Sequence, residues 1–555
     1  MVEKQGIPDG VDWEQDLGSE DDRQDLLLSR FLNAHDLQTL YSSFTSSVPD
    51  EALWRTHRDS RSFTVDEQTK RQVPYNRRFQ FVRMVGKPGS YGAAFLVLDI
   101  SSSDKAEHRP YIIKISIFDK AFMTEVDAMR YTLQNAINSN ISPTYVTPDS
   151  WFVSEFLPPS KGPWVGLERG LRQIEDFGEL IDEARLQESR SGSSTSSSVD
   201  TGEPLKVRGS DSSGGGGGDG SERTLFGYIV MEYANSGTLS TFYARHLRPR
   251  LDEGKDIAPI VTSIVFQIVF ALFSMIVIQL QHRDLASSNV VLTESAIRER
   301  QFGRKFQRPY LFTIGDTNFR LGDDTFSLML IDYSLAKQVR NTVPEDARIT
   351  RPQVRLFYRP PELLFIARGK RFVLFRNRSD MFSAGLSILR SVTRSNYLTR
   401  EEAPEGLAED IQRSCLTGEL STDTQRIVAR FICKSDDAEQ VAQYVWNLIM
   451  LIGPPTPRSW PGVENTDLYK LIKPYVDTEL GSTFRPTVYD RSDQIFQRLG
   501  EHGVTLVRRM LRWDPAQRPQ SLDLLQTHPF FDSIRSARDR ENEEPHGSRW
   551  GLDKL

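Results

Sequence analysis

One polar run in the second half of the chain constrains the fold more than any other stretch. Residues 281–292 read Q-H-R-D-L-A-S-S-N-V-V-L, so Asp284 and Asn289 lie five positions apart, just before three apolar residues. A loop that enters a buried strand can hold both side chains at one site. An Asp there can accept the proton of an attacking hydroxyl, and the amide oxygen of an Asn can ligate a divalent metal. The pattern predicts a catalytic loop; the alternative is a salt-bridged His-Arg-Asp turn without a chemical role.

Three further segments carry residue types that suit phosphate and metal binding. Asp332 ends a strand-like run and is followed by Tyr333 and Ser334. Lys114 lies inside the apolar run Y-I-I-K-I, where burial of its charge is costly unless an anion accompanies it. Upstream, a glycine-rich run can let backbone amides approach phosphates without a side chain in the way: Gly86, Gly89 and Gly92.

In this order the segments resemble the motifs of eukaryotic protein kinases. The resemblance implies that Asp284 is the catalytic base and that Lys114, with Glu125 on the following helix, orients the phosphates of ATP. Asp127 is the alternative partner of Lys114. The cofactors implied are ATP and Mg²⁺, with two metal ligands: Asn289 and Asp332.

Two more motifs are similar to kinase segments. The run Y-I-V-M-E-Y-A resembles the adenine-binding segment, with Met231 at the back of the site and the backbones of Glu232 and Ala234 facing the base. In the C-terminal half, Glu362 and Arg518 occupy the positions of a pair that kinases bury. Removing either would strand a buried charge, at a cost of roughly 3–5 kcal/mol.

The subgroup is also indicated. Residues 358–364 (Y-R-P-P-E-L-L) and 451–463 resemble the group that contains cyclin-dependent and mitogen-activated kinases. In that group an Arg at position 359 favours Pro after the phosphorylated residue. The D-Y-S variant of the metal motif looks more like haspin-type kinases, so the profile is mixed.

Regulation follows from the same resemblance. Thr350, five residues before Arg355, has the offset of an activating phosphosite, and Arg283 would clamp the phosphate. The alternative is an exposed threonine without a regulatory role.

The catalytic loop departs from the family at one point. The cation that steadies the γ-phosphate is missing, since Ala286 stands where Ser/Thr kinases have Lys and Ser288 where some Tyr kinases have Arg. Such a cation can contribute several kcal/mol to a phosphoryl transition state. Two interpretations therefore remain: a protein Ser/Thr kinase, and a pseudokinase scaffold that binds nucleotide or partners without efficient catalysis.

The resemblance predicts an α+β fold with a small, mainly-β N-lobe and a larger, mainly-α C-lobe. The expected organisation is an N-terminal extension with a helix (1–75), an N-lobe (79–233) with a disordered insertion (188–223), a C-lobe (234–531) with a second insertion (293–325), and a charged tail (532–555). We expect the second insertion to form a surface hairpin, with a metal loop as the weaker alternative. The tail is expected to be solvated.

The composition limits the classes of binding partner that we expect. The 69 basic and 75 acidic residues leave a net charge of −6, which gives no general attraction to nucleic acid. Cys415 and Cys433 do not make a disulfide framework, and the polar N-terminus has no signal-peptide core, so we expect a cytoplasmic or nuclear protein. Residues 260–280 carry no charge, but we expect a buried C-lobe helix there and not a membrane span. Protein substrates and a regulatory protein partner are the expected partners.

Overall fold

The structure is a computed structural model of the whole chain, and its contacts divide the chain into two units. The first contains Met1–Val126 and Pro148–Glu232, and the second contains Asp127–Thr147 and Tyr233–Leu555. The structure describes residues 64–65, 72–73, 79–89, 92–99, 109–117, 120–154, 226–294, 297–299, 306, 310–322, 326–338, 356–364, 376–393, 402–416, 435–481, 484–537 and 548–552. The helix expected in the N-terminal extension and the insertion expected at 188–223 lie outside these residues.

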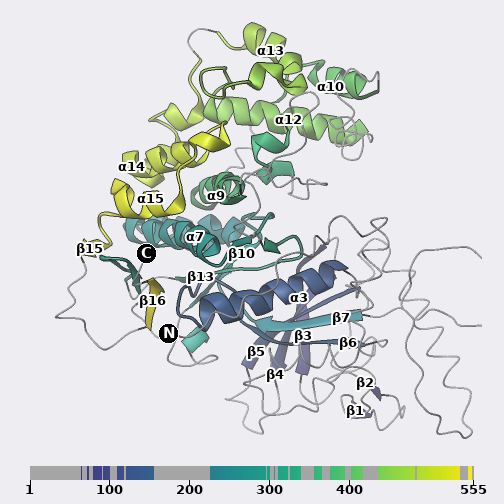
Figure 1. Cartoon of the computed structure of the whole chain (residues 1–555), viewed down its shortest axis with the longest axis vertical. Helices are drawn as coiled ribbons and strands as arrows, with labels where there is room; N and C mark the ends of the chain where they lie inside the picture. Colours follow the sequence, from purple (N-terminus) through teal and green to yellow (C-terminus); the bar gives the residue numbers. More distant parts are fainter. Residues whose placement is uncertain are drawn as a thin grey trace, which may run out of the picture. The chain divides into compact units, whose positions relative to one another are not determined.

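The first unit is built on an antiparallel sheet with the strand order β3-β4-β5-β7-β6 (Figure 1). Its strands are β3 (Phe79–Gly89), β4 (Gly92–Asp99), β5 (Arg109–Ile117), β6 (Pro148–Ser154) and β7 (Phe226–Glu232). Along β5 the buried Ile113 and Ile115 alternate with Lys114, because successive side chains of a strand point to opposite faces. A separate pair, β1 (Thr64–Val65) with β2 (Gln72–Val73), also belongs to this unit.

Helix α3 (Lys120–Thr132) follows β5 and continues into the short π-helix η4 (Leu133–Ile137). Its residues Phe122, Val126 and Met129 are buried at helical spacing. A Cβ on Gly227 of β7 would come within 2.4 Å of the Phe122 ring, so a glycine is needed there for the ring to pack on the sheet.

The second unit is mainly helical, with α7 (Ala258–Val277) in its core (Figure 1). Helix α7 contacts α9 (Arg376–Val392) and α15 (Ser521–Thr527), and α9 also contacts α14 (Gln494–Met510). The other helices of this unit are α6 (Arg248–Asp252), α10 (Leu407–Leu416), α12 (Ser435–Ile452) and α13 (Asp467–Glu479).

Among the described residues, α7 is the one helix with the length and apolar composition to cross a membrane. Within its most apolar stretch, 89% of the residues are buried inside the protein. The core helix of a soluble protein has the same length and composition. The burial therefore agrees with the helix that the sequence predicted for the C-lobe.

Two small sheets flank the predicted catalytic loop. Strand β10 (Val290–Glu294) pairs antiparallel with β13 (Phe326–Leu330) on one side and with β8 (Gly237–Thr238) on the other. Strand β9 (Leu280–Gln281) pairs with β14 (Lys337–Gln338). The loop between β9 and β10 and the segment between β13 and β14 are therefore held next to each other.

The second insertion forms the predicted hairpin, but the hairpin is not confined to the surface. Strands β11 (Tyr310–Ile314) and β12 (Thr317–Arg320) pair antiparallel. Phe312 and Phe319 are fully buried, and each ring centroid lies 5.0 Å from that of Phe266 on α7. The described residues contain no group of three or more Cys, His, Asp or Glu side chains placed to hold a metal, which gives the alternative of a metal loop no support.

The expectation of a solvated tail is wrong for the segment around Trp550, whereas Ser536 and Ala537 are exposed. Strand β15 (Arg535–Ala537) pairs with β12, and β16 (Ser548–Leu552) runs parallel to β11, so the tail completes a four-stranded sheet, β15-β12-β11-β16, which we call the accessory sheet. The hairpin alone would present unpaired backbone groups along both edges, and the tail strands pair with them. Trp550 is only 1% exposed, a feature that the charged composition of the tail concealed.

Candidate active site

Lys114, the predicted phosphate-binding lysine of the first unit, lies on β5, the central strand of its sheet. Lys114 Nζ on β5 lies 2.6 Å from Glu125 Oε2 on α3, which is the predicted ion pair. The alternative partner, Asp127, instead lies 3.6 Å from Arg130. Because Glu125 is only 2% exposed, its carboxylate is held close to the ammonium group with little competition from water.

The predicted glycine-rich run coincides with the hairpin between β3 and β4. Gly86 and Gly89 lie on β3, and Gly89 is opposite Gly92 at the start of β4. Gly92 has a φ of +152°, and a Cβ there would lie 2.4 Å from the carbonyl oxygen of Ile115. Only a glycine fits this position.

The predicted adenine-binding residues lie at and just after the end of β7. Met231 and Glu232 are 6% and 3% exposed and pair with Ile112 and Tyr111 of β5. Ala234 follows in the second unit, two residues after the strand ends.

In the second unit, the catalytic loop is anchored by Asp380 on α9. The backbone N–H groups of His282 and Arg283 donate to its two carboxylate oxygens, each at 3.0 Å. Burial raises the pKa of Asp380 to about 6, against the lowering effect of these two hydrogen bonds. Arg283 adopts a left-handed backbone with a φ of 65°, which turns the chain sharply just before Asp284.

The three predicted catalytic and metal residues of this unit are connected through backbone and side-chain hydrogen bonds. The amide nitrogen of Asn289 donates to the carbonyl oxygen and to Oδ2 of Asp284, both at 2.9 Å. The backbone N–H of Ile331 donates to the carbonyl oxygen of Asn289 at 3.0 Å. Asp332 is the next residue along the chain. Asp332 also has a left-handed backbone (φ 64°), and Ser334 Oγ donates to its Oδ1 at 3.0 Å.

The donor set suits magnesium. Since the amide nitrogen of Asn289 donates to Asp284, its amide oxygen, which also accepts from Ser288 Oγ at 3.5 Å, is the atom of this side chain that can ligate a cation, and Asp332 supplies a carboxylate. Mg²⁺ prefers such oxygen ligands, and it usually takes only one or two from the protein with the rest from water and phosphate. The residues present therefore fit the predicted ion.

The sequence did not reveal a second connection to the catalytic loop. Ser287 Oγ and Tyr358 Oη are both buried and lie 2.6 Å apart, and Arg390 on α9 donates to the same phenol oxygen at 2.9 Å. Tyr358 belongs to the short helix η9 (Leu356–Tyr358), just before Glu362. No local pattern in the sequence singles out Ser287 or Arg390.

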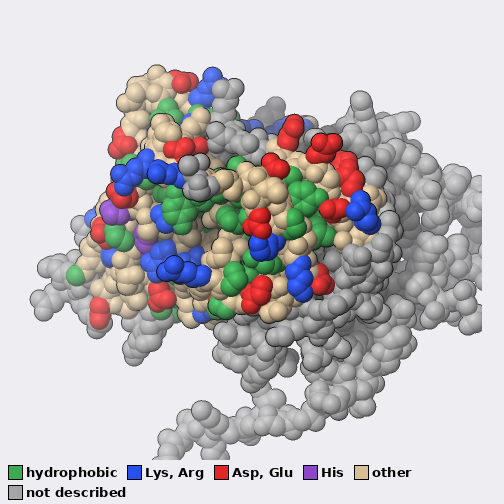
Figure 2. All heavy atoms as spheres, turned by 90° about the horizontal axis from the view of Figure 1, so that it is seen from above, with side chains coloured by type: hydrophobic (Ala, Val, Ile, Leu, Met, Phe, Trp, Pro, Cys, Tyr) green, Lys and Arg blue, Asp and Glu red, His purple; other side chains and the backbone are tan. Residues whose placement is uncertain are grey.

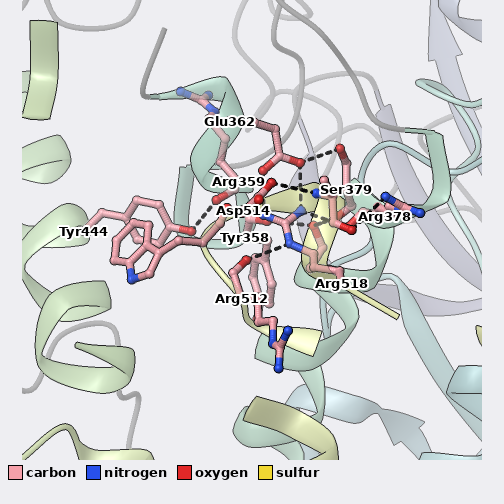
Figure 3. A network of polar contacts seen from close by, with 12 residues as sticks. Tyr358, Arg359, Glu362, Arg378, Ser379, Tyr444, Arg512, Asp514 and Arg518 are labelled. Carbon is pink, nitrogen blue, oxygen red and sulfur yellow. Dashed lines mark hydrogen bonds and ion pairs between the residues drawn. The ribbon is translucent and has the colours of Figure 1, made fainter. Parts of the chain in front are cut away.

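The predicted buried pair is formed (Figure 3). Arg518 Nη1 and Nη2 donate to Glu362 Oε1 and Oε2 at 2.8 and 2.7 Å, and Ser379 Oγ donates to Glu362 Oε1 at 2.7 Å. The remaining N–H groups of Arg518 donate to backbone carbonyls of three residues: Arg378, Arg512 and Trp513. Nearby, Tyr444 Oη donates to the carbonyl oxygen of Arg359 at 2.5 Å, and burial lowers the pKa of the Arg359 guanidinium to about 10.

The structure also describes Ala286, the position at which the catalytic loop departs from the kinase motif. Ala286, where a lysine was expected, has no exposed surface, and its N–H donates to the carbonyl oxygen of Asp284 at 2.9 Å. Arg355 and Thr350 lie outside the described residues. The activating phosphosite therefore stays a prediction.

Comparison with known proteins identifies the family. The family model described as "Protein kinase domain" matches residues 221–531, which is more than half of the chain. The chain therefore belongs to the protein kinase family. The predicted α+β kinase fold is confirmed: a sheet with one helix forms the first unit, and helices dominate the second.

Named relatives support the predicted group. Cyclin-dependent kinase C-3 of Oryza sativa subsp. japonica is 26% identical over 198 residues, covering 36% of this chain and 44% of that protein. Human cyclin-dependent kinase 9 is 24% identical over 253 residues, covering 45% of each. The chain thus spans less than half of the length of these relatives, and neither tests the haspin-like features.

A solved structure is also similar. It is described as "Structure of the CAK complex form Chaetomium thermophilum bound to ATP-gamma-S", and one of its chains matches with a TM-score of 0.44 and 15% identity, covering 86% of this chain and 98% of that one.

Proposed function

We propose that this protein transfers the γ-phosphoryl group of Mg-ATP to Ser or Thr hydroxyls of protein substrates. One observation carries the proposal: hydrogen bonds join Asp284, Asn289 and the segment of Asp332 into a single arrangement. A base and two oxygen ligands for a metal are therefore held together where phosphoryl transfer needs them.

Each residue has a stated role in this proposal. Asp284 accepts or orients the proton of the substrate hydroxyl, and Asn289 and Asp332 would hold magnesium, which neutralises charge on the phosphates. Lys114, held by Glu125, contacts the α- and β-phosphates. The nucleotide is bound by two further groups: the backbone of Gly86, Gly89 and Gly92, and the adenine-binding residues Met231, Glu232 and Ala234.

A second function, that of a pseudokinase scaffold, is favoured by Ala286. A fully buried methyl group replaces the expected cation at the γ-phosphate, so the transition state lacks a contribution worth several kcal/mol. A scaffold of this kind would bind nucleotide or protein partners without efficient transfer.

Phosphate transfer to peptides separates the two functions, whereas nucleotide binding does not. We expect the full-length chain with Mg-ATP to phosphorylate a Ser/Thr peptide library, with a preference for Pro after the acceptor residue. Asp284→Asn should remove the activity, and Asp477→Asn, an exposed carboxylate on α13, is the matched control. Transfer at the same rate by wild type and Asp284→Asn would reject the kinase proposal.

Partners and location belong to the same proposal. The relatives named as cyclin-dependent kinases motivate a regulatory protein partner. Acidic and basic side chains both occur on the face shown in Figure 2, in keeping with protein substrates. A cytoplasmic or nuclear location is tested by a fluorescent fusion, and the role of Thr350 by phosphopeptide mapping of the active protein.

A further inference from the structure

A loop of the second unit is held by two parts of the chain that are additions to the kinase motifs. The loop, residues 138–147, follows α3 and η4. It is contacted by the second insertion and by β16 of the tail, which begins 17 residues after the matched kinase region ends at residue 531.

The insertion reaches this loop through Arg298. This side chain is 1% exposed, and its guanidinium donates to the carbonyl oxygens of Pro143 and Tyr145, the latter at 2.7 Å. The same group lies 4.2 Å from the centre of the Phe306 ring. Because a planar guanidinium presents several donors in a fixed geometry, it can hold two carbonyls of one loop in a defined orientation, which the rotatable ammonium group of a lysine does less well.

The tail reaches the loop through Gly551. Its backbone N–H donates to the carbonyl oxygen of Asn140 at 2.9 Å. Its φ is +128°, and a Cβ there would lie 1.8 Å from the carbonyl oxygen of Thr313 on β11. The preceding Trp550 packs on Phe306 with ring centroids 5.6 Å apart, so the tail and the Arg298 contact share one aromatic ring.

The loop in turn contacts the strand that leads to the metal ligand. Leu330 N–H donates to the carbonyl oxygen of Thr144 at 3.0 Å, and Val146 N–H donates to that of Leu330 at 3.1 Å. Leu330 lies two residues before Asp332. The loop is therefore hydrogen-bonded to the strand that leads to Asp332.

We propose that Arg298 and β16 are positioning elements of the phosphoryl-transfer site. By holding residues 138–147, they hold Leu330 and so the backbone that presents Asp332 to the metal. The inference rests on the proposed function, but it assigns to the insertion and the tail a task that the kinase motifs do not contain. Neither element touches the nucleotide; both act through the loop.

The test uses the full-length chain with three changes: Arg298→Gln, Arg298→Lys and removal of residues 548–555. We expect Arg298→Gln and the truncation to lower kcat at least tenfold with less than a threefold change in KM for ATP. Arg298→Lys should recover part of the loss. Arg320 is an exposed residue on β12 of the accessory sheet. Arg320→Gln is the matched control and should leave kcat within twofold of wild type.

Hydrogen exchange provides a readout that does not depend on catalysis. The amides of Val146 and Leu330 should exchange at least tenfold faster in Arg298→Gln and in the truncated chain, and at the wild-type rate in the control. If the wild type transfers no phosphate, the proposed function fails, while exchange still decides whether these elements hold the loop. Unchanged exchange, or a kcat within twofold of wild type in both variants of an active enzyme, overturns the inference.

Misfolding of the truncated chain is separated by adding the missing strand in trans. A peptide with the sequence of residues 548–555 should restore kcat and slow exchange at Val146, whereas a peptide with Ala in place of Gly551 should not, because its Cβ cannot approach Thr313. If the truncated chain does not fold, Gly551→Ala in the full-length chain gives the same readouts. Equal restoration by both peptides would reject the role of β16.

Discussion

Two buried polar clusters of the second unit each contain a carboxylate, but the groups that compensate its charge differ. Around Glu362, a carboxylate meets the guanidinium of Arg518 through two hydrogen bonds, and the rest of the guanidinium is used by carbonyls (Figure 3). Around Asp380, a carboxylate meets the backbone N–H groups of the catalytic loop. The first cluster compensates charge with charge, and the second uses a charge to hold backbone in place.

The two clusters also differ in their effect on the stability of the protein. Burial and, to a smaller extent, the charge of Asp284 disfavour an ionised Asp380, and the two peptide donors with the charge of Arg283 do not offset this, so its pKa stays raised at about 6. The buried Asp380 thus lowers the stability of the protein while it orders the catalytic loop, whereas the Glu362–Arg518 pair stabilises the fold. Substitutions at Glu362 and Arg518 should therefore lower the free energy of unfolding, whereas substitution of Asp380 should change how that free energy depends on pH.

The largest effect is expected at Asp332, the proposed metal ligand. Asp332→Asn should reduce phosphoryl transfer by at least a thousandfold, because magnesium loses its carboxylate, while the melting temperature changes little. Lys114→Met should reduce transfer similarly and also lower the melting temperature, since Glu125 is buried beside it. Peptide phosphorylation and thermal unfolding measure both. Wild-type turnover in either variant would show that these residues are not catalytic.

The Glu362–Arg518 pair should affect stability instead. Glu362→Gln and Arg518→Met should each lower the free energy of unfolding by roughly 3–5 kcal/mol, because each leaves its partner buried without an opposite charge. The double variant Glu362→Leu/Arg518→Met should lose less than the sum of the two. Urea unfolding of all four proteins gives this comparison, and strictly additive losses would mean that the two side chains are not coupled.

The anchor of the catalytic loop should be recognisable by its pH dependence. Since burial raises the pKa of Asp380 from 3.8 to about 6, the folded protein binds this proton more tightly than the unfolded chain. Its contribution to stability is then largest below about pH 4 and falls by roughly 3 kcal/mol as the pH rises through 6. Asp380→Asn lacks this titration, so the wild type's free energy of unfolding should decrease relative to the variant over that range. A difference that stays constant with pH would contradict the assignment.

The smallest effect is expected at the hydroxyl pair between the catalytic loop and η9. Ser287→Ala and Tyr358→Phe should each cost about 1 kcal/mol of stability, the net value of one buried hydrogen bond. Tyr358→Phe should cost more than Ser287→Ala, because it also removes the acceptor of Arg390. Chemical denaturation decides the order, and the reverse order would mean that Arg390 does not depend on the phenol.

The sequence predicted contacts between residues that are close in the chain better than contacts between residues that are far apart. Lys114 and Glu125 are 11 positions apart on adjacent elements, and the predicted pair is formed. Asp284 and Asn289 are five apart within one loop, and their side chains are hydrogen-bonded. The anchor Asp380, in contrast, lies 98 positions from His282, and no local pattern in the sequence connects the two residues.

The sequence by itself determined the kinase family, the order of its motifs, the pairing of Glu362 with Arg518 and the buried character of α7. These depend on residue types at short spacings or on a long uncharged run, both of which can be read along the chain. Only the tertiary structure decided that Arg298 is buried against a loop 155 positions away and that Trp550 belongs to a core. A lone arginine in a basic segment and a lone tryptophan in a charged tail form no pattern along the chain, and their contacts with residues 138–147 and Phe306 arise only in the folded protein.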